Sequence, residues 1–149
     1  MRRALILVLA ATVAVGLAGS AFARGLPTLL GNSPKGPIKL MIRPAQIIYT
    51  GDGSGILGGF DGGQGMGFGH LRWTRWTTGS ALGHGADWID DCRPDCADGT
   101  FTAHKATVNA FRPRGGRFTR LTISTSYRGK PLVSHMKLVR SGHSLFYTF

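Results

Sequence analysis

The side chains best suited to chemistry surround the only two cysteines of the chain, Cys92 and Cys96. Three residues separate the two thiols, and Pro94 can bend this short loop so that the sulfurs meet. An even number of cysteines in an exported chain favours oxidation to a disulfide. Closing so short a loop stabilises a fold by only about 2 kcal/mol, so we predict a disulfide whose main role is to fix a turn between strands.

A metal site is the alternative for the same segment. His84 and His104 each stand eight positions outside the nearer cysteine, and two thiolates with two imidazoles would suit tetrahedral zinc. Five of the seven acidic residues, all Asp, fall within residues 87–98, where their carboxylates could collect Ca²⁺. The spacings match no common zinc or calcium module, and Asp also serves backbone amides in turns. We therefore predict no metal and no other cofactor.

Basic and aromatic side chains supply the candidate ligand-binding residues. The candidate contacts for an anionic cell-wall polymer or polysaccharide are Arg112, Arg114, Arg117 and Arg120. The candidate stacking surfaces for sugar rings are Trp73, Trp76 and Trp88. The alternative for the tryptophans is packing in the core, which we favour because large aromatic side chains contribute much of the buried area of a small domain. The alternative for the arginines is a solvated surface.

No catalytic residue is predicted. The chain lacks G-x-S-x-G, and both cysteines are expected to be oxidised, so no nucleophile stands out. The Gly-rich stretch 51–69 lacks the G-x-x-x-x-G-K-[ST] pattern of a phosphate loop. A hydrolase using His or Asp side chains remains an alternative, as does a secreted inhibitor that presents the turn at Pro94 to another protein.

The first 23 residues have the three parts of a signal peptide. Arg2 and Arg3 precede an apolar run over residues 4–17, and Ala21-Phe22-Ala23 offers small residues for cleavage. The apolar run is shorter than the roughly 20 residues that cross a bilayer, so we expect a secreted protein with no membrane span after cleavage. Removing both arginines from the 18 basic residues leaves 16 against 7 acidic ones, about +9. Such a charge favours anionic polymers over any specific nucleic acid, or it only maintains solubility.

The elements that must position these residues are strands. Glu is absent and Gly occurs 23 times, a composition that disfavours helix. Residues 24–39 are rich in Pro and Gly, and we expect a flexible leader there, followed by a single β domain over residues 40–149. Strands are expected within 38–50, 70–77, 81–89 and 100–111, and a three-strand meander over 120–127, 132–139 and 145–149. The prediction is an all-β fold, a small β-sandwich or barrel of about seven to eight short strands.

Four motifs resemble a known family. They are Y-T-G-D-G-S-G at 49–55, W-T-x-W at 73–76, A-x-G-x-G at 81–85 and C-x-P-x-C-A-x-G at 92–99. Together they are similar to an uncharacterised family of small secreted actinobacterial proteins, and the resemblance covers residues 42–132. It implies an extracellular setting and a disulfide, and it implies no catalytic residue. This chain departs from the pattern in a longer Gly-rich insertion at 58–69 and in the basic stretch 112–117.

Overall fold

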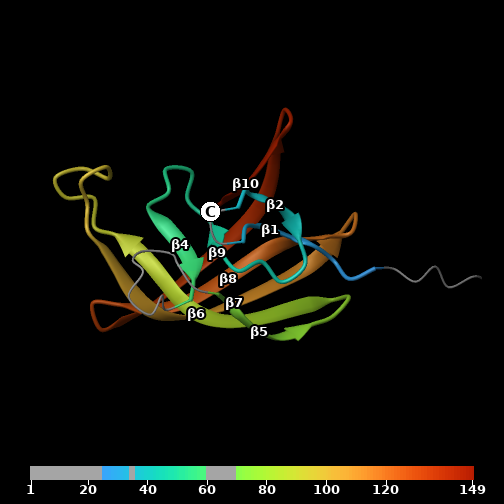
Figure 1. Ribbon diagram of the computed structural model, residues 1–149. Coiled ribbons are helices and arrows are strands. Elements are labelled where there is room, and N and C mark those ends of the chain that lie inside the picture. Colours follow the sequence, from blue (N-terminus) through green and yellow to red (C-terminus); the bar gives the residue numbers. More distant parts are fainter. Residues whose placement is uncertain (1–24, 34–35, 60–69) are drawn as a thin grey trace, which may run out of the picture.

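The computed structural model describes residues 25–33, 36–59 and 70–149, and the expected signal peptide lies outside these ranges. Within them the chain is all-β, with ten strands and no helix, which confirms the predicted fold class (Figure 1). The strands are β1 (Leu29–Gly31), β2 (Lys39–Met41), β3 (Ile47–Ile48), β4 (Gly55–Gly58), β5 (Arg72–Trp76), β6 (Ser80–Asp90), β7 (Phe101–Arg114), β8 (Arg117–Tyr127), β9 (Lys130–Ser141) and β10 (Ser144–Thr148). None of the described residues forms a helix that could cross a membrane.

Eight strands form one curled antiparallel sheet. Its order is β10-β9-β8-β7-β6-β4-β3, and β5 pairs with the first half of β6 while β4 pairs with the second half. The meander expected near the C-terminus is confirmed as β8, β9 and β10. Its two tight turns contain Gly129 (φ 75°) and Gly142 (φ 58°), because glycine adopts a left-handed backbone without the steric strain that a side chain causes.

The alternation of side chains in the long strands separates the two faces of the sheet. Val108 on β7, Leu121 on β8 and Met136 on β9 point to the inner face, where each is at most 2% exposed. Phe118, which is 0% exposed, is the largest of the fully buried side chains in this core. The outer face carries the polar residues of the same strands, so a strand's period of two decides which residues can meet a ligand.

The small sheet of β1 and β2 lies over the inner face, above the long strands β6–β8 (Figure 1). Thr28 forms a parallel bridge to Arg117 at the start of β8, while Asn32 pairs with Gln46 just before β3. The segment 28–32 therefore connects β8 to the opposite edge of the curled sheet. This arrangement is consistent with the expected small barrel or sandwich.

The structure corrects the expectation of a flexible leader over residues 24–39. Leu29 is 0% and Leu30 is 7% exposed, and both belong to the hydrophobic core. The hydroxyl of Tyr147 on β10 donates a hydrogen bond to the carbonyl of Leu30 at 3.1 Å. The Pro and Gly residues around β1 do not keep it out of the core, because β1 pairs with β2 and also contacts β10 through Tyr147.

Candidate anion-binding surface

Three of the four predicted arginines border one open hollow. Arg112 and Arg114 at the end of β7 and Arg120 on β8 lie around a depression of about 310 Å³. Lys137 on β9 joins them because it stands directly opposite Arg120 in the β8–β9 register. We call these four residues the arginine groove. The fourth predicted arginine, Arg117, pairs with Arg114 across the hairpin and does not line the hollow.

The backbone at Arg112 is unusual for a residue with a side chain. Its φ of 52° lies in the left-handed region, which costs a non-glycine residue about 1 to 2 kcal/mol. The hydroxyl of Thr119 donates a hydrogen bond to the Arg112 carbonyl at 2.7 Å and so holds this conformation. Strained backbone of this kind is often retained where it directs a functional side chain, and here the side chain borders the groove.

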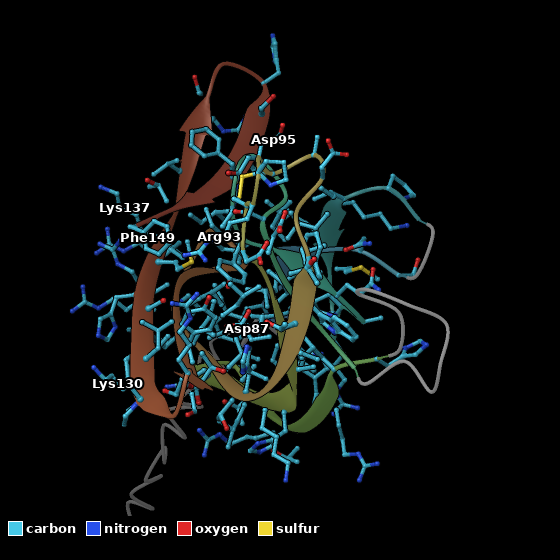
Figure 2. The ribbon with its side chains drawn as sticks, turned by 90° about the vertical axis from the view of Figure 1, so that its left-hand side faces the viewer. Asp87, Arg93, Asp95, Lys130, Lys137 and Phe149 are labelled. Atoms are coloured by element: carbon cyan, nitrogen blue, oxygen red, sulfur yellow. A yellow bond between two sulfur atoms is a disulfide. The ribbon has the colours of Figure 1, made fainter. Side chains whose placement is uncertain are left out.

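A smaller hollow of about 130 Å³ continues from the groove along β8 and β9. Arg120 and Lys137 border both hollows, and His135 and Phe149 complete the smaller one. Phe149 is 72% exposed, and Figure 2 shows it beside Lys137 at the rim of the molecule. No acidic side chain of the described residues lines either hollow. This combination of cations and one exposed ring could bind an anionic polymer.

Trp76 lies in the core and Trp73 packs against it, as the favoured interpretation predicted, so these two do not form the candidate stacking surface for sugar rings. Trp76 is 7% exposed, and its ring meets that of Trp73 edge to face at 82°, with centroids 4.7 Å apart. Each of the three indole N–H groups donates to a backbone carbonyl, at 2.8 Å for Trp73, 3.0 Å for Trp76 and 3.1 Å for Trp88. The accepting carbonyls belong to residues 44, 27 and 59, so the indoles fasten irregular segments to the sheet. The alternative of core packing describes Trp76, and Trp73 packs partly buried against the same core.

Cys92 and Cys96 form the predicted disulfide, in the exposed turn between β6 and β7. Figure 2 shows the bonded sulfurs beside Arg93 and Asp95. The sulfurs lie near the Asp90 carboxylate, but bonded to each other they supply no thiolate for a metal. His84 on β6 pairs with Thr107 on β7, and paired residues share a face of the sheet. His104 lies three positions before Thr107 on β7, so His84 and His104 point to opposite faces. The zinc alternative is therefore wrong.

The aspartates around the disulfide serve the backbone of the turn. Asp91 accepts hydrogen bonds from the amides of Thr100 at 2.9 Å and Arg93 at 3.2 Å, and these bonds lower its pKa. Asp90 accepts from the Cys92 amide at 3.0 Å, and its carboxylate lies against Gly99 so closely that no Cβ would fit there. The turn interpretation that we favoured over Ca²⁺ therefore accounts for Asp90 and Asp91.

Asp87 is the one aspartate that sequence reasoning should have singled out and did not. It lies in the interior of the domain (Figure 2) and is 1% exposed. The Tyr49 hydroxyl donates a hydrogen bond to its carboxylate at 2.7 Å. Burial raises the pKa of Asp87, although the Tyr49 hydrogen bond and the nearby His104 act in the opposite direction. Burial and the adjacent carboxylate also raise the pKa of Tyr49. The pair lies in the interior, so we interpret it as structural.

Comparison with known proteins gives no match to any family model, curated protein or solved structure. The resemblance to small secreted actinobacterial proteins therefore stays a prediction. What the geometry defines is a class: a small all-β domain with a basic hollow on its surface.

Proposed function

We propose that this protein is a secreted, non-enzymatic module that binds an anionic extracellular polymer, such as a teichoic acid or an acidic polysaccharide, through the arginine groove. The observation that carries the proposal is the convergence of Arg112, Arg114, Arg120 and Lys137 around one hollow that has no acidic lining residue in the described ranges. Guanidinium groups suit this role because their planar N–H donors match phosphate and carboxylate oxygens.

The groove favours a polymer over a small metabolite. It is open, and three of its four side chains, those of Arg112, Arg114 and Lys137, are exposed to water. Each contact with an anion is therefore individually weak. A repeating anion compensates because several contacts form at once and release condensed counterions. The predicted signal peptide and the disulfide support an extracellular location, since disulfides persist in oxidising compartments.

The proposal is tested by retention of the mature chain, residues 24–149, on immobilised heparin and on immobilised lipoteichoic acid over a range of salt concentrations. The test variant is the double substitution Arg120→Gln and Lys137→Gln. The matched control is Lys130→Gln with Arg140→Gln, which removes the same charge from exposed positions on β9 outside the groove.

We expect the groove variant to elute at clearly lower salt than the wild-type chain, with the slope of log affinity against log salt reduced by about one unit for each lost contact on a densely charged polymer. The control should shift little. Equal shifts in both variants would show that net charge alone drives retention, and retention that does not change with salt would exclude electrostatic binding altogether.

A further inference from the structure

A second basic hollow lies on the outer face of the sheet, and it shares no residue with the arginine groove. Its volume is about 600 Å³. Its polar lining comes from four adjacent strands and from His70, two positions before β5. The strand residues are Arg72 on β5, His84 on β6, Lys105 and Thr107 on β7, and Ser124 on β8.

The register of the sheet produces this cluster. Arg72 stands opposite His84, His84 opposite Thr107, and Thr107 opposite Ser124, so these residues form one continuous row across four strands. Lys105 lies two positions before Thr107 on β7 and therefore on the same face. The Thr107 hydroxyl and Nδ1 of His84 lie within hydrogen-bond distance, at 3.3 Å, which fixes the imidazole over the row.

From this row we infer a binding site for a tetrahedral oxyanion, that is, a phosphate or sulfate group. Nitrogen donors reach the hollow from Arg72 on β5, His84 on β6 and Lys105 on β7, a hydroxyl reaches it from β8, and no acidic side chain of the described residues lines it. A tetrahedral anion presents oxygens in several directions and can accept from donors on all four strands at once. A carboxylate presents only two oxygens in one plane, so it can use fewer of these donors.

The histidines make the charge of this hollow depend on pH. Imidazole generally gains its charge between pH 8 and 5, and a bound anion favours the charged form. The groups that face His84 are His70 and Arg72 on one side and Lys105, Thr107 and Ser124 on the other. The bound anion and a proton on the imidazole should stabilise each other. Anion affinity should therefore rise as the pH falls.

This site stands independently of the proposed function, but it also extends it. Ser124 and Arg120 are four residues apart on β8, a distance of roughly 13 Å along a strand. A polymer with regularly spaced phosphate groups could thus contact both hollows. The site would remain an oxyanion site even if no polymer binds the arginine groove.

The test is a titration of the mature chain with sodium sulfate, followed by two-dimensional NMR of the backbone amides at pH 5.5 and pH 8.0. Sulfate is the probe because it does not titrate in this range, whereas phosphate does. The variants are Arg72→Gln and His84→Gln, and the control is His143→Gln in the exposed β9–β10 turn. Sodium acetate and sodium phosphate are run as separate arms.

We expect the largest shifts at residues 72, 84, 107 and 124, with tighter binding at pH 5.5 than at pH 8.0. Because the side chains are exposed, His84→Gln should weaken sulfate binding at pH 5.5 only about two- to fivefold, and much less at pH 8.0. Arg72→Gln should weaken it at both pH values, and His143→Gln should have no effect.

Three results would overturn the inference: shifts confined to the arginine groove, affinity that does not depend on pH, or acetate binding as tightly as sulfate. Comparison of the phosphate and sulfate arms at pH 5.5 would show which oxyanion the site prefers. Failure of heparin retention with a positive sulfate result would reject the polymer proposal and leave this site intact.

Discussion

Tyr49→Phe removes only the hydroxyl that donates to the buried Asp87 carboxylate, so it measures how much this hydrogen bond contributes to the free energy of unfolding. The lost hydrogen bond is 2.7 Å long, both partners are at most 8% exposed, and the acceptor carries a charge above its pKa. A hydrogen bond to a charged group contributes about 1.5–3 kcal/mol, so we expect a loss of roughly 2–3 kcal/mol in the free energy of unfolding above the Asp87 pKa. This is a large share of the stability of a small domain.

Tyr147→Phe is the matched control. Its hydroxyl is also buried, but it donates to the neutral carbonyl of Leu30 at 3.1 Å. Removing it should cost about 1 kcal/mol, with no dependence on pH in the acidic range. The comparison separates the effect of the charge on Asp87 from the effect of losing a buried hydroxyl.

The pH dependence has a definite sign. Because burial raises the pKa of Asp87 above its unfolded value, the stability linked to this group is fully present below the unfolded pKa of about 3.9 and is lost as the pH rises through the folded pKa. Tyr49→Phe removes an interaction that favours the carboxylate, so it raises the folded pKa further and makes this loss larger. The penalty of the variant should therefore grow from about 1 kcal/mol in acid to its full value at neutral pH.

Urea unfolding followed by tryptophan fluorescence at several pH values between 3.5 and 8 measures these penalties for both variants. Tyr49→Phe and Tyr147→Phe with equal penalties at every pH would refute the reasoning, because Asp87 would then not be carrying a charge that Tyr49 stabilises. A decreasing penalty for Tyr49→Phe with rising pH would contradict the inference that the Tyr49 hydrogen bond favours the charged form of Asp87 and so lowers its pKa.

Three further changes test the packing of the domain. Gly99→Ala should destabilise, because a Cβ at this position would overlap the Asp90 carboxylate, whereas Gly51→Ala, which meets nothing within 4 Å, should be nearly neutral in thermal unfolding. Phe118→Ala should cost about 3–5 kcal/mol by urea unfolding, against a small effect for Phe146→Ala at a 42% exposed position; similar costs would contradict the assigned core. Reduction of the disulfide should cost no more than about 2 kcal/mol in the same assay, and complete unfolding on reduction would show a larger role for the turn.

Much of the fold could be predicted because it depends on local patterns. The alternation of Leu121 and Ile123 with polar residues predicted β8, and Gly129 with a positive φ marks the turn to β9. Residues 29–31 escaped this reasoning, because three residues are too few to show a period and Thr28 pairs with Arg117, nearly ninety positions away. Pairing of this kind depends on the closed shape of the sheet, which the sequence pattern does not contain.

The candidate site was only partly predictable for the same reason. Arg112, Arg114 and Arg120 are close in sequence, and all three belong to the single hairpin of β7 and β8. Lys137 joins them only because the β8–β9 register places it opposite Arg120. The row of Arg72, His84, Thr107 and Ser124 across four strands depends on three successive registers, so no spacing in the sequence could have predicted it.

The position of the acidic residues explains why the basic surface remains available to an outside anion. Asp87 is buried and bound to Tyr49, and Asp90 and Asp91 are occupied by backbone amides in the disulfide turn. Carboxylates held in this way cannot swing over to neutralise the outer face, because each would leave a buried or hydrogen-bonded group without its partner. Asp87, Asp90 and Asp91 therefore stabilise the interior and one turn, and no acidic side chain of the described residues lines either hollow.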